Sequence, residues 1–182
     1  MELRKAVDNL CIYDPGFSGY AEAFVSDLGG SSDKCQVSCI ADLQSAISSF
    51  TNVKYLEIIL HGLPGMIQFA DNVVMVGPHL GTMTQGTNLI AKNARILFAS
   101  CDIGKGEAGD LFMAELAKRM LVGKGGIIGA ATVANTVYLP RSRFAMGPFM
   151  ELSDGSTLKV RRYDLSGKQI GARDVDRFGR VR

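Results

Sequence analysis

The segments Ile58-Ile59-Leu60-His61-Gly62 and Ile96-Leu97-Phe98-Ala99-Ser100-Cys101 decide the fold of this chain. Each is an apolar run, too short for a comfortable helix, that ends at a reactive side chain, and such runs are typical of buried strands. In an open α/β sheet, ligands bind just outside the carboxyl ends of the strands. Because a histidine ends one run and a cysteine ends the other, we expect a base and a nucleophile to share one crevice.

Strand-like and helix-like segments alternate over the first two-thirds of the chain. Their patterns predict strands over residues 7–13, 35–40, 53–60, 95–100 and 127–131, and helices over residues 18–28, 41–50 and 107–121. Residues 66–76 alternate around a polar break as a small hairpin does, and residues 82–92 contain enough Leu, Ile and Ala for a short helix. This alternation favours an α/β fold with a mainly parallel sheet covered on both faces.

The segment over residues 107–121 carries the clearest helical pattern. Acidic residues in its first turn and basic residues in its last turn complement the helix dipole. Its apolar and small residues recur on one face at helical spacing, namely Gly109, Phe112, Met113, Leu116, Ala117 and Met120. The sequence therefore predicts an amphipathic helix that follows the Cys101 strand.

The character of the chain changes after Thr132. Residues 139–143 are typical of an exposed loop, and strand-like runs follow over residues 149–152, 157–163 and 169–175. Asp154-Gly155 and Ser166-Gly167 separate these runs and are typical of hairpin turns. We therefore expect an α/β core over residues 1–140 and an antiparallel β flap over residues 141–182, either within the same domain or as an appendage.

Composition places the chain among soluble globular proteins. A length of 182 residues suits one domain, or one domain with an appendage, with a sizeable core. The apolar fraction of 47% and the charged fraction of 21% are ordinary for this class, and no apolar stretch approaches the roughly 20 residues that span a bilayer. No signal peptide is recognisable at the start. We expect a cytoplasmic protein, or one exported without such a signal as part of a larger protein.

The net charge of +2 hides an asymmetry along the chain. Residues 141–182 carry ten Lys and Arg against five Asp and Glu, whereas the first 140 residues carry ten against thirteen. A basic segment of this kind marks contact with nucleic acid, polyphosphate or acidic membrane in some proteins and is a solvated surface in others. Its basic residues are not interleaved with aromatic ones, which argues against nucleic acid. We favour a solvated surface and keep an anionic activator of the flap as an alternative.

Three of the four cysteines lie among apolar or β-prone neighbours. We interpret Cys11, Cys35 and Cys39 as small buried hydrophobes. On a strand, the sulfurs of Cys35 and Cys39 would lie roughly 13 Å apart, at about 3.3 Å per residue. Because the chain has only two histidines, a structural zinc centre is not expected, and neither is another metal or an organic cofactor.

Cys101 has the surroundings that nucleophilic chemistry requires. A thiol reacts as the thiolate, which a neighbouring base or helix N-terminus favours. His61 is the expected base, and the helix that opens near Glu107 is expected to direct its N-terminal amides toward the same edge of the sheet. The backbone N–H groups of Gly62 and Cys101 are then candidate donors to a developing oxyanion, and one such donor contributes about 2.7–4 kcal/mol to lowering the barrier.

These residues carry a resemblance to a known superfamily. A hydrophobic block that ends in His-Gly, followed by another that ends in Ala-Ser-Cys, is similar to the caspase-like cysteine peptidases, which include caspases, metacaspases, legumains, clostripain, gingipains and separase. Residues 60–65 and 96–109 look especially like a bacterial branch found near the start of large surface or adhesin-like proteins. The likeness covers roughly residues 53–133 and, weakly, the two strands before them.

The resemblance implies a caspase-like three-layer sandwich in which the histidine follows the third core strand and the cysteine follows the fourth. It implies His61 as general base or acid, Cys101 as nucleophile, and the amides of Gly62 and Cys101 as the oxyanion hole. The implied activity is that of a cysteine endopeptidase. Asp102-Ile103-Gly104 departs from the residues that follow the cysteine in caspases and metacaspases, so no substrate preference is carried over. A catalytically inactive caspase-like module, used for binding or regulation, is the alternative.

Each candidate also has a structural interpretation. A cysteine at a strand end is often structural, and a histidine before glycine is often a turn residue. Their joint placement at successive strand ends favours the functional interpretation of His61 and Cys101. His79 follows Gly77-Pro78 in an expected surface loop and is a minor alternative for the base.

Gly104-x-Gly106-x-x-Gly109 has the spacing of a dinucleotide-binding loop, between a strand and a helix. Such a loop also needs an acidic residue about 20 positions further on to bind the ribose. No Asp or Glu lies between Glu115 and Glu151. We interpret the glycines as a tight turn with close packing of helix on sheet, and keep a nucleotide-binding α/β domain as a third function.

Two acidic residues and two basic ones bear on specificity. Asp14, just past the first strand, and Asp102, beside the nucleophile, are candidates to line a pocket that favours Lys or Arg by charge. The alternative is that both are solvated or capping residues. Arg141 and Arg143 lie in the exposed loop, where proteolysis concentrates, and form a candidate self-cleavage site.

Overall fold

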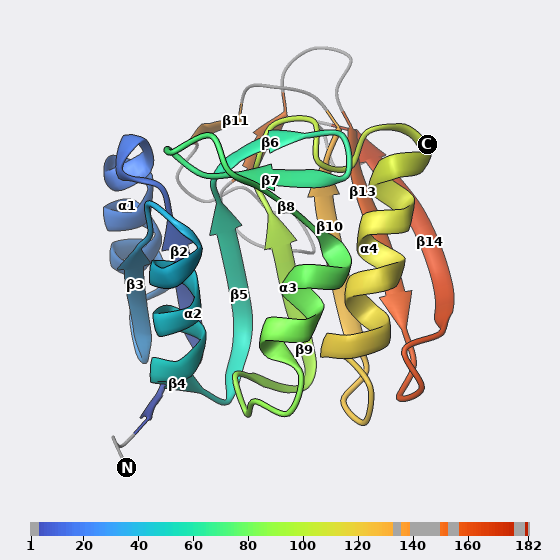
Figure 1. Cartoon of the computed structure of the whole chain (residues 1–182), viewed down its shortest axis with the longest axis horizontal. Coiled ribbons are helices and arrows are strands. Elements are labelled where there is room, and N and C mark those ends of the chain that lie inside the picture. The colour runs from blue at the N-terminus through green and yellow to red at the C-terminus, as the bar shows by residue number, and fades with distance from the viewer. Residues whose placement is uncertain (1–3, 133–135, 139–149, 153–156, 177–180, 182) are drawn as a thin grey trace.

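The fold is known from a computed structural model, which describes residues 4–132, 136–138, 150–152, 157–176 and 181. A seven-stranded sheet runs through the molecule with helices packed on it (Figure 1). Its strands are β2 (Asn9–Tyr13), β3 (Ser32–Gln36), β5 (Val53–Ile59), β9 (Ile90–Phe98), β10 (Gly126–Ala131), β13 (Thr157–Tyr163) and β14 (Gln169–Asp176). The helices are η1 (Pro15–Phe17), α1 (Ser18–Leu28), α2 (Ile40–Ser49), α3 (Gly77–Thr84) and α4 (Gly106–Met120).

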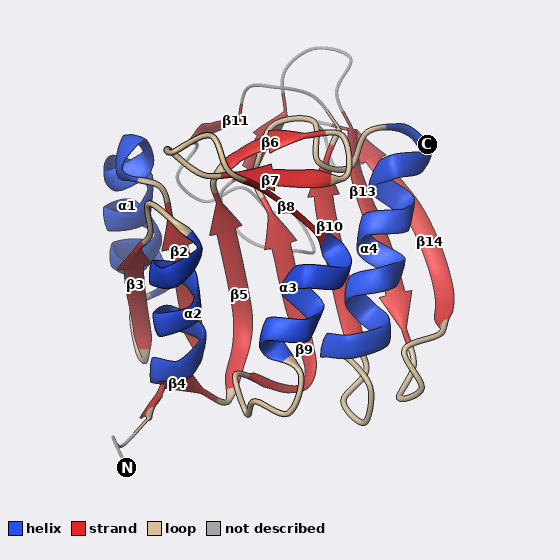
Figure 2. Ribbon diagram, in the orientation of Figure 1, coloured by secondary structure: helices blue, strands red, loops and turns tan. Residues whose placement is uncertain are grey.

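Shorter strands form three small sheets beside the central one. β1 (Lys5–Ala6) pairs with β4 (Phe50–Thr51), and β11 (Thr136–Tyr138) pairs with β12 (Met150–Leu152). A three-stranded antiparallel sheet of β6 (His61–Leu63), β7 (Met66–Gln68) and β8 (Val74–Val76) lies across the carboxyl ends of the central strands (Figure 2). The sequence pattern over residues 66–76 therefore predicted the β7–β8 hairpin correctly, and β6 extends it.

The central sheet is mixed and mostly parallel, in the order β14-β13-β10-β9-β5-β2-β3. The strands from β3 to β10 are parallel, whereas β13 and β14 are antiparallel to their neighbours. This arrangement confirms the predicted α/β class with a mainly parallel sheet. The strands of the expected C-terminal flap extend this same sheet, because β13 pairs with β10 from Gly126↔Tyr163 to Ala131↔Leu158.

Helices cover both faces of the sheet and bury two separate cores. α2, α3 and α4 pack on one face, which we call the α4 face, where Leu56 and Ile58 of β5 are buried. α1 packs on the opposite face, the α1 face, where Tyr55 and Ile59 of the same strand are buried. The alternation of side chains along a strand explains this division, since residues two apart share a face.

α1 begins and ends at the predicted residues, and α4 buries the predicted face, whose six members are Gly109, Phe112, Met113, Leu116, Ala117 and Met120.

Residues 35–40, which the sequence predicts as one strand, do not form a continuous strand. β3 ends at Gln36, and α2 already begins at Ile40 with Cys39 as its N-cap. The cause is Asp42, whose Oδ2 accepts a hydrogen bond from the Ser38 N–H (2.8 Å), a reach-back that starts a helix.

Residues 82–92 contain no separate helix. α3 lies earlier, at Gly77–Thr84, because Pro78 suits the first turn of a helix, where its missing N–H leaves no bond unmade. His79, expected in a surface loop, is therefore an exposed residue of α3.

The candidate self-cleavage residues Arg141 and Arg143 lie outside the described residues. Within the described part of the chain, no helix has both the length and the apolar character needed to cross a membrane.

Candidate functional site

The strand order changes direction at β2, and this change marks a candidate ligand site at the carboxyl ends of β2 and β5. β2 stands between β3 and β5, so the chain moves to one side after β2 and returns past it to reach β5. In open α/β sheets, ligands bind outside the carboxyl ends of the two strands at such a switch. Asp14 follows β2 directly, and His61 follows β5 after one residue. His61 therefore lies at the position where this architecture provides a crevice.

Cys101 lies at the same edge, one strand further along. β5 and β9 pair in parallel with Ile58 opposite Phe98, and the Ala99 N–H donates to the Ile58 carbonyl (3.0 Å). Beyond the last pair, the Ser100 hydroxyl accepts a hydrogen bond from the Leu60 N–H (3.2 Å). The segment after β5 and the segment after β9 therefore run side by side beyond the strand ends, toward His61 and Cys101.

Gly62 is the point of closest approach between the two motifs. A Cβ on Gly62 would lie 2.1 Å from the Cys101 carbonyl oxygen and 3.0 Å from the Ser100 Cβ. Only a residue without a side chain can occupy this place, so glycine is needed here for contact as well as for any role of its N–H. The structure thus brings Gly62, the residue after His61, against Ser100 and Cys101.

His61 contacts two residues from the loop after β2. Its Nε2 lies 3.8 Å from Asp14 Oδ1, and the His61 and Phe17 rings are 5.5 Å apart between centroids. The His61 side chain is 54% exposed, whereas that of Asp14 is 6% exposed. The imidazole of His61 is therefore half-exposed and faces a buried carboxylate.

The loop that carries Asp14 is held by its own hydrogen bonds. The Asp14 N–H donates to the Ile59 carbonyl (3.0 Å), and the Asp14 carbonyl accepts from the Phe17 N–H (2.8 Å). Asp14 Oδ1 also accepts from the Gly16 N–H (2.9 Å), which makes Asp14 the N-cap of η1. Asp14 is therefore a capping residue, one of the two alternatives for it, and it also faces His61.

Asp14 and Asp102 share an unusual feature. Each has one buried carboxylate oxygen, Oδ2 of Asp14 and Oδ1 of Asp102, that forms no hydrogen bond within the described residues. Asp102 has a positive φ of 56°, which Asp tolerates better than most residues, and its Oδ2 is 3.7 Å from Lys105 Nζ. A buried carboxylate oxygen without a donor is costly, so each of these two positions calls for an explanation.

The loop between Cys101 and α4 is packed closely on the sheet. The Gly104 N–H donates to the Ala131 carbonyl (2.7 Å), and a Cβ on Gly104 would lie 2.6 Å from the Ala130 carbonyl oxygen. A Cβ on Gly109 would lie 2.2 Å from the Gly104 carbonyl carbon. Gly106, with φ of 60°, provides the turn into the helix. These contacts agree with our interpretation of the three glycines as a tight turn with close packing.

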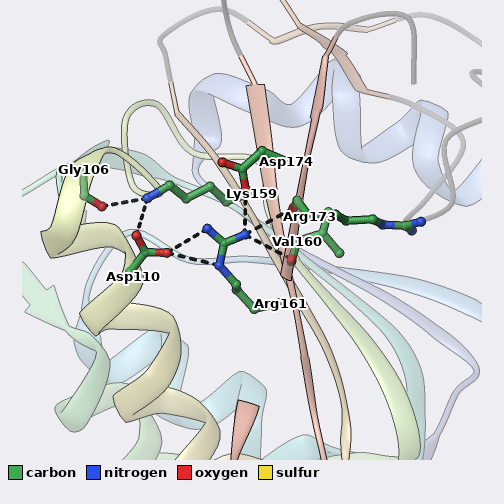
Figure 3. Close-up of polar contacts among 7 residues, drawn as sticks. All are labelled: Gly106, Asp110, Lys159, Val160, Arg161, Arg173 and Asp174. Atoms are coloured by element: carbon green, nitrogen blue, oxygen red, sulfur yellow. Dashed lines mark hydrogen bonds and ion pairs between the residues drawn. The ribbon is translucent and has the colours of Figure 1, made fainter. Parts of the chain in front are cut away.

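Two basic residues of β13 hold the first turn of α4 (Figure 3). Lys159 Nζ donates to Asp110 Oδ2 (2.6 Å) and to the Gly106 carbonyl (2.8 Å), while Arg161 Nη2 donates to Asp110 Oδ1 (3.0 Å). Arg161 Nη1 donates to Asp174 Oδ1 on β14 (2.7 Å). The C-terminal hairpin is thereby bound to the helix that follows the Cys101 loop, and two of its basic charges are engaged in ion pairs.

The remaining cysteines have different surroundings. Cys11 is fully buried on the α1 face, and burial, with the nearby Glu57, raises the pKa of its thiol well above the usual value. Burial also raises the pKa of the half-buried Cys35 thiol. Because Cys39 is the N-cap of α2, the separation we predicted for two sulfurs on one strand does not apply. No group of three or more His, Cys, Asp or Glu in the described residues is arranged to hold a metal ion.

Sequence reasoning missed four residues, namely Phe17, which contacts His61, Ser100, which bonds to the Leu60 N–H, and the bonded pair Tyr20 and Glu57. Glu57 is completely buried in β5, and the hydroxyls of Tyr20 and Tyr55 both donate to its carboxylate. A charged residue inside an otherwise apolar strand segment was a visible signal for Glu57. The pattern carried no comparable signal for Phe17, because its contact with His61 joins segments 44 positions apart in the sequence.

One family model matches part of the chain. Residues 34–123, just under half of the 182, are similar to the family described as Domain of unknown function (DUF4347). The matched segment contains both His61 and Cys101 but ends before β10 and begins after Asp14. No curated protein and no solved structure matches the chain.

Proposed function

We propose that this protein is a caspase-like cysteine endopeptidase in which Cys101 is the nucleophile and His61 the base. The observation that supports the proposal is the contact of Gly62 with the Cys101 carbonyl, because it brings the residue after His61 against Cys101 at the carboxyl edge of the sheet. The order of these residues supports it too. In chain order, His61 follows the third parallel strand of the central sheet, β5, and Cys101 follows the fourth, β9.

In the proposed reaction, His61 takes the proton of the Cys101 thiol and the thiolate attacks the substrate carbonyl carbon. The Gly62 and Cys101 N–H groups donate to the oxyanion of the tetrahedral intermediate. His61 then gives the proton to the departing amine. Water, deprotonated by His61, hydrolyses the thioester and restores the thiol.

We further propose that the substrate presents Lys or Arg before the scissile bond. The carboxylates of Asp14 and Asp102 support this preference by charge complementarity, and each has one oxygen that makes no hydrogen bond within the described residues. Asp14 directly follows β2, and Asp102 follows Cys101 in the loop after β9. The strands β2 and β9 flank β5, the strand that precedes His61. The preference depends on the peptidase proposal, since it specifies the substrate of that site.

Site-resolved alkylation with iodoacetamide tests the Cys101–His61 pair. A thiol of ordinary acidity is only a few per cent thiolate at pH 7, so activation leaves room for about a tenfold gain in rate. We expect Cys101 to react faster than Cys35 or Cys39, and to lose this advantage in His61→Ala. His79→Ala is the matched control, since it removes an exposed imidazole on α3.

The same variants are then tested for peptide hydrolysis. We expect cleavage by the wild-type protein and by His79→Ala, and none by Cys101→Ala or His61→Ala. If Cys101 reacts no faster than Cys39, and His61→Ala changes nothing, the peptidase proposal is wrong. The chain would then fit a catalytically inactive module for binding or regulation.

A further inference from the structure

A buried carboxylate joins α1 to the strand that leads to His61. Glu57, on the α1 face of β5, receives a hydrogen bond at Oε2 from the Tyr55 hydroxyl (2.8 Å) and another at Oε1 from the Tyr20 hydroxyl. Tyr55 lies on β5 itself, whereas Tyr20 lies in the first turn of α1. The Tyr20–Glu57 bond is therefore a polar attachment of the start of α1 to the sheet.

Other titratable groups surround this cluster from the neighbouring strands. Cys11 of β2 stands opposite Glu57 in the register, with Lys34 of β3 beyond it. Burial raises the pKa of the Tyr55 hydroxyl, and the charge of Arg95 on β9 acts in the opposite direction. Burial raises the pKa of Glu57 to about 7, while the hydrogen bonds from the two tyrosines act in the opposite direction. Burial thus favours the protonated carboxyl group and outweighs the two hydrogen bonds, which favour the ionised one.

The start of α1 is directly linked to His61. Tyr20 follows Phe17 by three residues, so both lie within one turn of chain, and the Phe17 ring contacts the His61 ring. The loop from Asp14 to Phe17 is closed by its own hydrogen bonds, from the Gly16 N–H to Asp14 Oδ1 and from the Phe17 N–H to the Asp14 carbonyl. A displacement of the first turn of α1 would therefore move Phe17 relative to His61, whereas Asp14 is also held to β5 by its N–H bond to the Ile59 carbonyl.

We propose that Tyr20 and Glu57 are positioning residues for His61, because their hydrogen bond fixes the first turn of α1 and thereby holds Phe17 against the imidazole. Tyr55 has a different role. Its hydroxyl bonds to Glu57 within the same strand, so its loss leaves α1 attached. The consequence for Cys101 rests on the proposed function, whereas the position of His61 can be measured without it.

Tyr20→Phe and Tyr55→Phe form a matched pair for the test. Each removes one hydroxyl from the Glu57 carboxylate and keeps the aromatic ring, but only Tyr20 belongs to α1. The first measurement is the NMR signal of the His61 ring, which reports its surroundings. The second is the rate of Cys101 alkylation from about pH 5 to 9, the range in which histidine changes charge, below the unfolding temperature of each variant.

We expect Tyr20→Phe to shift the His61 ring signals, to displace the pH profile, and to lower the His61-dependent part of the alkylation rate by about two- to tenfold, the range that one net hydrogen bond spans. Tyr55→Phe should leave all three close to wild type even where it lowers the unfolding temperature equally. Unchanged His61 signals in Tyr20→Phe, or equal changes in both variants, would overturn the proposal.

Two results separate this proposal from the peptidase proposal. If His61→Ala leaves Cys101 alkylation unaltered while Tyr20→Phe still shifts the His61 signals, the Cys–His pair is wrong and the positioning role stands. Should Tyr20→Phe not fold, Glu57→Leu replaces it as the test variant. It removes both acceptor oxygens and hence the bond from the Tyr20 hydroxyl, and His61 signals identical to wild type would then refute the positioning role.

Discussion

The carbonyl oxygen of Cys101 occupies the place where a side chain on Gly62 would stand, 2.1 Å from an ideal Cβ. The two motifs that end β5 and β9 are therefore in backbone contact. Because a carbonyl cannot yield as a flexible side chain does, the separation of His61 from Cys101 depends on this glycine.

Gly62→Ala is expected to separate the two motifs. The new methyl group must move the backbone, which costs about 1–3 kcal/mol of unfolding free energy for an overpacked site. The variant should also lose the His61-dependent part of Cys101 alkylation. Gly19→Ala is the control, because a Cβ at Gly19 in α1 meets nothing within 4 Å, and alanine favours a helix by up to about 1 kcal/mol. Equal stability of Gly62→Ala and wild type would contradict the contact.

Asp14→Asn should change the substrate preference more than the stability of the fold. The amide keeps an oxygen that can accept from the Gly16 N–H, but it loses the negative charge beside His61 and the orphan carboxylate oxygen. In a positional-scanning peptide library we expect the preference for Lys or Arg to weaken. Asp8→Asn, a charge change at the start of β2, serves as the control. A wild-type preference for Asp would contradict the assignment of this pocket.

The stability of the protein should depend on pH through Glu57. The folded-state pKa of Glu57, about 7, lies above its ordinary value of 4.5, so the folded protein binds the extra proton between these values. The contribution of Glu57 to the unfolding free energy therefore falls by roughly 3 kcal/mol at most as pH rises from about 4.5 to 7. Above pH 7 it levels off.

Glu57→Gln isolates this effect. Urea denaturation at a series of pH values gives the unfolding free energy of wild type and variant. The wild-type value minus the variant value should decrease across that window. A difference that is constant with pH, or that increases, would show that Glu57 stays ionised throughout.

Arg161→Met should destabilise the protein by about 1.5–3 kcal/mol, the usual contribution of hydrogen bonds to a charged group. The Arg161 side chain is 9% exposed and joins Asp110 of α4 to Asp174 of β14. Arg162→Met, at the exposed neighbouring position, should stay within about 0.5 kcal/mol of wild type. Urea denaturation measures both. Equal effects of the two substitutions would mean that the ion pairs shown in Figure 3 contribute nothing specific.

The sequence was informative where a local pattern carries the information. Helical spacing identified the buried face of α4, and short apolar runs identified β5 and β9, because side-chain periodicity depends only on near neighbours. It failed between Cys35 and Ile40, where β3 ends at Gln36 and a hydrogen bond from the Ser38 N–H to the Asp42 side chain starts α2. It also missed α3, since the Gly77-Pro78 start suits a loop and a helix equally.

By itself, the sequence determined that His61 and Cys101 each end a buried strand and that a glycine follows the histidine. Only the tertiary structure decided which strands are neighbours, and hence that Gly62 touches Cys101 and that Asp14 and Phe17 contact His61. The same holds for Glu57, whose partner Tyr20 comes from a helix 37 residues earlier. Contacts of this kind arise from the order in which strands pair, and the periodicity of one segment carries no record of that order.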